Sequence, residues 1–244
     1  MSDKTRRVLA IILALAMVGS LAAGVILSSL GGGSGNSAPG AGQSGSSSAH
    51  GDPREAEDDI ALARRDADDP TAMGDVDAPL VLIEYADYRC PYCGVFNQDT
   101  LPTIVEEYVD TGKVRIEWRD LPLFGEQSSD AAVAARAAGR QDRFWEYHDA
   151  VYADAPERGH LEVTRDKLLA WAEEVDVPDT EQFEEDLDDP QLLDLVEADA
   201  REGQQVGATG TPTFVIGHEA LVGAQPIGLF RDLLDDQLEA VGVQ

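Results

Sequence analysis

The distribution of apolar residues divides the chain into an N-terminal apolar run and a longer part with periodic apolar and polar positions. The run covers residues 8–30, from Val8 to Leu30, and holds 23 residues without a charge after a basic stretch at residues 1–7. A helix of this length is about 35 Å long, enough to cross a bilayer. Cleaved signal peptides have shorter apolar cores, of about 7–15 residues, and an A-x-A-like cleavage site. We therefore predict an uncleaved transmembrane signal anchor, with a cleaved signal peptide as the alternative.

The residues after this anchor are predicted to lie outside the cytoplasm. Basic residues remain on the cytoplasmic side, so residues 1–7 form the predicted cytoplasmic end. Residues 31–69 are rich in Gly and Ser and then in acidic residues, a composition typical of a linker. The chain is predicted to cross the cell membrane once. Its folded domain, residues 70–244, lies on the extracytoplasmic side, where disulfides persist.

Residues 70–244 show strand and helix periodicities in an order typical of an α/β fold. Short apolar or alternating runs predict strands, and apolar residues three or four positions apart predict helices. No strand pattern occurs between about residues 126 and 205, which predicts a block of helices inserted between two parts that contain strands. The predicted order is strand 80–85, helix 94–110, strand 114–118, the helical block, strands 213–216 and 220–222, and helix 226–240.

The chain is strongly acidic, with 47 Asp and Glu against 18 Lys and Arg and a formal net charge of −29. Proteins that bind nucleic acid need cationic side chains to neutralise phosphates, so this composition argues against nucleic acid as a partner. The acidic residues are spread along the chain. This distribution indicates a solvated acidic surface rather than one binding site.

The only two cysteines, Cys90 and Cys93, lie between the first predicted strand and the first predicted helix. Pro91 suits the first helical position, because its missing N–H would have no partner there. Cys90 is then at the helix N-terminus, where unpaired N–H groups and the helix dipole stabilise a thiolate. Cys93 is three residues further along on the same side and is the expected resolving thiol. The pair therefore predicts a redox-active dithiol.

Two other interpretations of the cysteine pair are weaker. A structural disulfide rarely closes so short a loop, because such a loop constrains the unfolded chain least. A zinc site would need two more ligands, and no second cysteine pair exists. The four histidines, His50, His148, His160 and His218, have no paired metal-ligand spacing. We therefore expect no metal, and no cofactor other than the redox-active disulfide Cys90–Cys93.

Several further motifs accompany Cys90-Pro91-Tyr92-Cys93 in a defined order. They are Ala78-Pro79, Glu84-Tyr85, the segment from Arg119 to Leu123, Phe144-Trp145, and the segment from Gly207 to Phe214. This combination resembles the DsbA family of exported thiol–disulfide oxidoreductases, over about Met73 to the C-terminus. The resemblance implies an α/β, thioredoxin-like fold: β-α-β, a helical insertion at about residues 126–205, then β-β-α.

The resemblance also implies roles for individual residues. It implies a cis peptide bond before Pro212, beside the disulfide, which would turn the Thr211 backbone outward to pair with a substrate strand. An ordinary trans proline at the start of an edge strand is the alternative. Pro91, Tyr92, Thr211 and Pro212 are then the expected substrate-binding residues. Glu84 would be a buried carboxylate of raised pKa that relays a proton for Cys93, unless it is a solvated strand charge.

The expected function is that of an enzyme, a protein thiol–disulfide oxidoreductase anchored in the lipid bilayer through residues 8–30. It would exchange the Cys90–Cys93 disulfide with cysteines of exported proteins, as an oxidase, together with a membrane or extracytoplasmic redox partner. Strongly oxidising members of the family resemble C-P-H-C, whereas Tyr92 here carries no positive charge. A reductase or isomerase of the same fold, and a redox-silent peptide-binding module, are therefore the alternatives.

Overall fold

The computed structural model describes residues 62–243. The predicted cytoplasmic end, transmembrane anchor and most of the predicted linker lie outside these residues. Within residues 62–243, no helix is long and apolar enough to cross a membrane.

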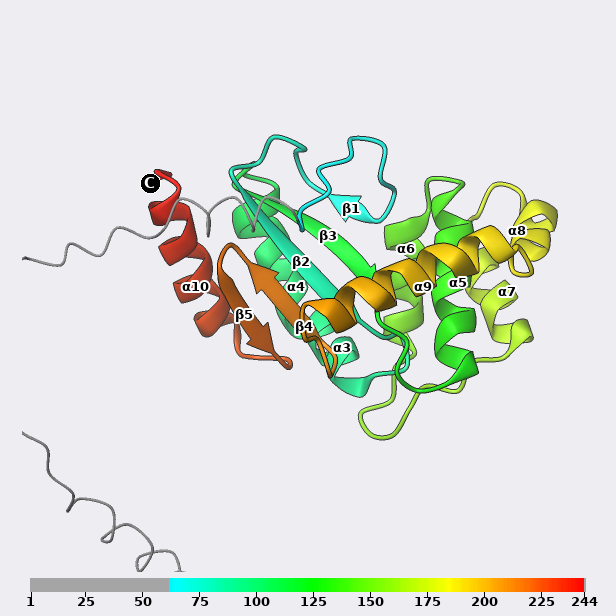
Figure 1. The fold of residues 1–244 in the computed structure, drawn as a ribbon. Coiled ribbons are helices and arrows are strands. Elements are labelled where there is room, and N and C mark those ends of the chain that lie inside the picture. Colours follow the sequence, from blue (N-terminus) through cyan, green and yellow to red (C-terminus); the bar gives the residue numbers. More distant parts are fainter. Residues whose placement is uncertain (1–61, 244) are drawn as a thin grey trace, which may run out of the picture. The chain divides into compact units, whose positions relative to one another are not determined.

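A five-stranded sheet lies at the centre of the fold (Figure 1). Its strand order is β1-β3-β2-β4-β5, with β2 and β3 parallel and the other neighbouring pairs antiparallel. The two central strands, β2 and β3, are buried along their whole length. The strands are β1 (Ala72–Met73), β2 (Leu80–Ala86), β3 (Val114–Asp120), β4 (Thr213–Ile216) and β5 (Glu219–Val222).

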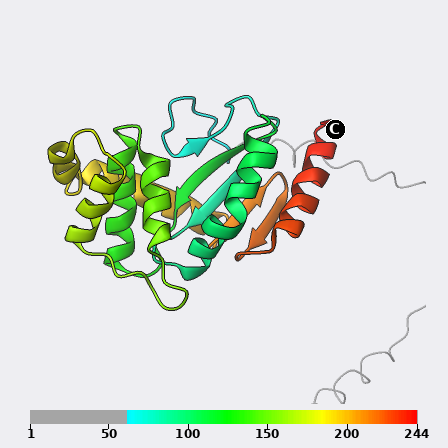
Figure 2. The same ribbon diagram turned by 180° about the vertical axis from the view of Figure 1, so that it is seen from behind.

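Helices cover both faces of this sheet (Figure 2). Apolar residues of α4 and α10 pack on one face, against Leu82 and Phe214, whereas Ala200 of α9 belongs to the cluster on the other face, with Ile83. The helical elements are α3 (Pro91–Val95), the π-helical turn η1 (Phe96–Thr100), α4 (Leu101–Ile104), the π-helical turn η2 (Val105–Val109), α5 (Glu126–Gly139), α6 (Phe144–Ala153), α7 (Arg165–Glu174), α8 (Thr180–Asp186), α9 (Pro190–Gln205) and α10 (Ile227–Ala240).

Helices α5 to α9 form the insertion between β3 and β4, as the sequence pattern predicts. Their apolar core is rich in alanine from α5 and in aromatic rings such as Tyr147 and Phe183. The same core contains Cys90 and Cys93. The mixed α/β fold with a helical insertion is therefore confirmed, and the insertion packs directly against the cysteine motif.

The packed part of the chain extends further towards the N-terminus than residue 70, where we predicted the domain to start. The backbone N–H groups of Arg64 and Arg65 both donate to the carboxylate of Glu117. The Arg64 side chain pairs with Asp199 and Glu202 on α9. Residues 62–66 therefore belong to the folded unit. Their backbone N–H groups and the Arg64 side chain bind carboxylates on β3 and α9, and the sequence pattern does not reveal these distant partners.

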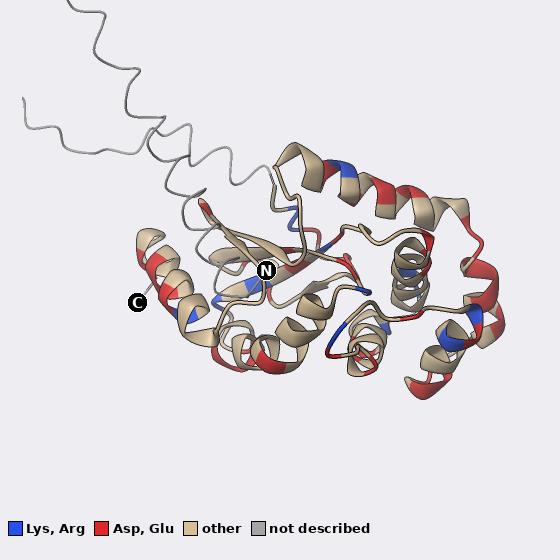
Figure 3. Cartoon of the chain, turned by 90° about the horizontal axis from the view of Figure 1, so that it is seen from below, with Lys and Arg blue, Asp and Glu red and all other residues tan. Residues whose placement is uncertain are grey.

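Acidic residues are spread over the surface of this unit. Figure 3 shows Asp and Glu on the C-terminal helix α10 and on helices of the insertion, with few Lys and Arg between them. This distribution agrees with an acidic, solvated exterior and does not form one anionic patch.

Candidate active site

Cys90 occupies the turn where β2 ends and α3 begins (Figure 1). It is the N-cap residue of α3, with Pro91 in the first turn, and its carbonyl accepts the N–H of Gly94 at 3.2 Å. Its own N–H donates to the carbonyl of Asp87. Both cysteines are free thiols, and both are buried. The structure therefore shows the dithiol form, with Cys90 at a helix N-terminus as predicted.

Thr211 and Pro212 lie beside Cys90, although more than a hundred residues separate them in sequence. The Thr211–Pro212 peptide bond is cis. The Cys90 Sγ lies 3.3 Å from the Thr211 carbonyl oxygen, to which the thiol donates. We expected the Thr211 backbone to face outward. In the structure its carbonyl instead faces the Cys90 sulfur.

The surroundings of Cys90 favour its thiolate and lower its pKa from 9.0 to about 6. The hydrogen bond from the Cys93 thiol is the largest cause of this lowered pKa. Burial acts in the opposite direction and raises the pKa. Hydrogen bonds from Thr211 and from the N–H groups of Cys93 and Tyr92 lower it further. The Thr211 hydroxyl is buried and has no hydrogen-bond partner among the described residues. It is placed to donate to the sulfur once the sulfur is charged.

Cys93 has the opposite electrostatic environment. Burial raises its pKa well above 9.0, and the hydrogen bond to Cys90 and the charges of Cys90 and Glu84 raise it further. At neutral pH, Cys93 is therefore a thiol and Cys90 is largely a thiolate. This difference assigns the nucleophile and the resolving group to the positions that the sequence indicates.

Glu84 is buried on β2, at 2% exposure, between Trp118 on β3 and Phe214 on β4. Burial raises its pKa from 4.5 to about 8. Its Oε2 has no hydrogen-bond partner within residues 62–243. A buried carboxyl in this state is protonated at neutral pH and can donate a proton.

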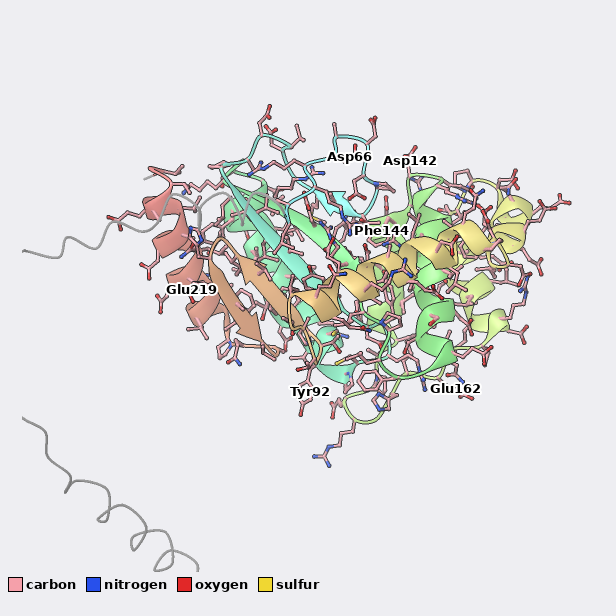
Figure 4. All side chains as sticks on the ribbon, in the orientation of Figure 1. Asp66, Tyr92, Asp142, Phe144, Glu162 and Glu219 are labelled. Carbon is pink, nitrogen blue, oxygen red and sulfur yellow. The ribbon has the colours of Figure 1, made fainter. Side chains whose placement is uncertain are left out.

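Several large apolar side chains on the elements next to the cysteine motif are exposed. Tyr92 is 65% exposed and points outward from α3 (Figure 4). Val95 on α3, Leu123 after β3 and Val222 on β5 are also exposed, and Val222 pairs with Thr213 next to Pro212. The sequence pattern identified Tyr92 but not the other three, because it does not show which apolar residues are exposed.

Asp87 and Arg89 are two further residues of the site that sequence reasoning missed. The buried Asp87 carboxylate accepts the N–H groups of Arg89, Leu123 and Phe124, while burial raises its pKa. The sequence did contain a signal for Asp87, because an Asp three residues before Cys90 is typical of an Asx turn. No group of three or more metal-ligating side chains occurs in the described part of the chain.

Comparison with known proteins agrees with this geometry. The model of the family described as thioredoxin matches residues 66–236. The chain belongs to this family. A probable disulfide bond formation protein D from Bacillus cereus is 31% identical over 148 residues, which cover 59% of this chain and 68% of that protein.

Solved structures extend the comparison to the fold. Oxidised BdbD from Bacillus subtilis matches with a TM-score of 0.65 and 26% identity, over 69% of this chain and 92% of that one. Wolbachia pipientis alpha-DsbA1 matches with a TM-score of 0.62 and 23% identity, over 70% of this chain and 92% of that one, and supports the fold alone. The family match, the disulfide bond formation protein D relative and BdbD together identify this thioredoxin-family chain as a thiol–disulfide oxidoreductase.

Proposed function

We propose that the enzyme oxidises cysteine pairs of exported proteins with its Cys90–Cys93 disulfide. The observation that carries this proposal is the opposite shift of the two thiol pKa values, to about 6 for Cys90 and well above 9.0 for Cys93. A stabilised Cys90 thiolate favours the reduced enzyme. The disulfide of such an enzyme is therefore a good oxidant of other dithiols.

The reaction has two exchange steps. A substrate thiolate attacks the Cys90 sulfur, an S–S bond forms between them, and Cys93 leaves as a thiolate that takes up a proton. A second substrate thiolate then attacks the substrate sulfur of this mixed disulfide, and Cys90 leaves as a thiolate. The substrate loses two electrons and gains a disulfide, while the enzyme becomes the dithiol. A redox partner must reoxidise it.

Glu84 is the proposed proton donor in the first step. Cys93 is a poor leaving group unless it is protonated as it departs, because its thiolate is strongly disfavoured by burial. The protonated Glu84 carboxyl, with a pKa near 8, can supply this proton at neutral pH. Pro91, Tyr92, Thr211 and Pro212 are the proposed contacts of the substrate segment, since the first two follow Cys90 directly and the Thr211 carbonyl contacts its sulfur.

The reduction potential tests the oxidase assignment. We expect a value clearly above that of thioredoxin, about −270 mV, because the Cys90 thiolate stabilises the dithiol form. Equilibration with glutathione buffers measures it, and the ultraviolet absorbance of the thiolate measures the Cys90 pKa in the same protein. A potential near −270 mV would reassign the enzyme to the reductases. A dithiol inert to a thiol-labelling reagent would identify a redox-silent peptide-binding module.

We also propose that residues 8–30 anchor the enzyme in the cell membrane with its catalytic domain outside. The support is the uncharged length of this segment and the basic residues before it. Fractionation of cells followed by external protease should find the domain in the membrane fraction and accessible from outside. A soluble mature form that lacks about 30 residues would show a cleaved signal peptide instead.

A further inference from the structure

Arg89, the residue before Cys90, joins three separate segments of the chain. Its Nε donates to the carbonyl of Leu161 at 2.7 Å, and its Nη1 donates to the carbonyl of Phe124. Leu161 lies between α6 and α7, and Phe124 lies between β3 and α5. One guanidinium group therefore connects the active-site turn with two loops at the ends of insertion helices.

His160 completes a closed set of contacts around Arg89. Its Nδ1 lies 3.2 Å from the carbonyl oxygen of Arg89, and because a carbonyl only accepts, the imidazole is the donor. Its ring packs on the ring of Phe124, with 4.1 Å between the centroids. Arg89, Phe124 and His160 thus contact one another in pairs. We call these three residues the Arg89 clasp.

A second set of contacts joins the active-site helix to the insertion. A Cβ atom added to Gly94 would lie 2.8 Å from the Cβ of Ala155, so α3 and the chain after α6 are in close contact there. Gln98 donates to the carbonyl of Tyr152 at 2.6 Å. The active-site helix is therefore packed against the insertion, and Arg89 joins the turn before it to the same insertion.

We propose that the Arg89 clasp positions Cys90 for thiol–disulfide exchange by holding the active-site turn against the two insertion loops. Arg89 is a positioning residue in this scheme, not a catalytic one. The groups that favour the Cys90 thiolate are the Cys93 thiol, Thr211 and the N–H groups at the start of α3. Within the described residues, the hydrogen bonds of the Arg89 guanidinium go to the carbonyl oxygens of Leu161 and Phe124 and not to the sulfur, so we assign it an effect on the sulfur through geometry.

Arginine suits this role for a structural reason. Its planar group donates to two carbonyls in different directions at once, whereas a lysine ammonium is a single point donor on a flexible stem. The Arg89 carbonyl belongs to the peptide bond that leads directly to Cys90. Movement of this peptide would change the distances from the sulfur to Thr211 and to the helix N–H groups together.

The test is a thiolate titration of the reduced full chain carrying Arg89→Ala. We expect the Cys90 pKa to rise by about one unit, so that the thiolate fraction at pH 6 falls about fivefold. Arg89→Lys should restore only part of this shift. Arg165→Ala is the matched control, since Arg165 is exposed and pairs with Glu184 and Asp188 within the insertion. The control should titrate like the parent.

His160→Ala gives a second, milder test, because His160 is exposed and its removal leaves the core intact. It should shift the Cys90 pKa in the same direction as Arg89→Ala, and it decides the matter if Arg89→Ala does not fold. A folded clasp variant that titrates like the parent would overturn the proposal. This inference rests on the proposed function, but a parent pKa at or above about 8.5 would refute the activated thiolate itself, whatever the variants do.

Discussion

Replacement of Cys93 by serine is expected to leave a reactive Cys90 that forms a stable mixed disulfide. In the parent Cys90 is largely a thiolate at pH 7, because its pKa is about 6, and in the variant the serine hydroxyl can donate to the sulfur in place of the Cys93 thiol. It attacks a disulfide, one sulfur of that disulfide leaves as a thiolate, and the other stays bound to Cys90. Without Cys93 no neighbouring thiol resolves the adduct. Incubation of Cys93→Ser with an oxidised protein or glutathione disulfide should therefore give a covalent adduct, measurable by intact mass.

Cys90→Ser is the matched control for this experiment. It keeps the buried Cys93, whose pKa is raised well above 9.0 by burial, so little thiolate is present at pH 7. We expect this variant to form the adduct at least about 100-fold more slowly than Cys93→Ser. The reasons are the lower thiolate fraction of Cys93 and its poorer accessibility to the disulfide. Equal rates for the two variants would contradict the assignment of Cys90 as the nucleophile.

The sequence predicted the parts of the site that depend on local structure. Pro91 and the spacing of Cys90 and Cys93 placed the pair at a helix N-terminus, and the structure confirms that position. At the other end of the insertion the same local rule holds, because Asp189 caps α9 with Pro190 in its first turn. Local rules suffice in these places because the responsible contacts lie within one turn of a helix.

Strand β3 shows where local rules fail. Its alternation of apolar and charged residues is typical of a strand with one solvated face, yet Arg115, Glu117 and Arg119 are all buried. Residues 62–66 and α9 cover that face and supply complementary groups: Arg64 N–H to Glu117, and Glu202 to Arg119. A sequence pattern shows charge but not the distant partner that makes burial of the charge possible.

The Arg89 clasp was not predictable for a related reason. Arg89 directly precedes Cys90, and an isolated arginine near a cysteine is usually interpreted through its charge. Its partners in the structure are the carbonyls of Phe124 and Leu161, which carry no side-chain signature. Only the packing of the insertion against the active-site turn brings these carbonyls within reach.

Two buried glutamates on adjacent strands, Glu84 and Glu117, have pKa values that are shifted in opposite directions. Glu117 on β3 accepts hydrogen bonds from Arg119 and from two backbone N–H groups. Burial alone would raise its pKa, but these contacts lower it overall, so Glu117 is ionised. Glu84 on β2 has no such compensation, and burial raises its pKa to about 8. The fold stabilises the charge of one carboxylate and opposes that of the other.

Glu84→Gln is therefore expected to stabilise the protein at neutral pH. In the unfolded chain Glu84 ionises above its ordinary pKa of 4.5, whereas in the folded protein it stays protonated up to about pH 8. Between these values the folded state binds more protons, so the free energy of unfolding falls as pH rises. This penalty reaches about 3 kcal/mol at pH 7. Glutamine avoids it, so the gain should approach that value at pH 7 and vanish near pH 4.

Glu117→Gln is the matched control, and its effect should have the opposite sign. The substitution leaves Arg119, which is fully buried, without a charged partner in β3, and loss of one member of a buried ion pair costs about 3–5 kcal/mol. Denaturant unfolding of the three proteins at pH 4 and pH 7 measures both effects. If Glu84 is the proton donor for Cys93, Glu84→Gln should also slow oxidation of substrate while it stabilises the fold. A Glu84→Gln protein less stable than the parent at pH 7 would show that the carboxylate is charged and paired, and that Cys93 must receive its proton from another group.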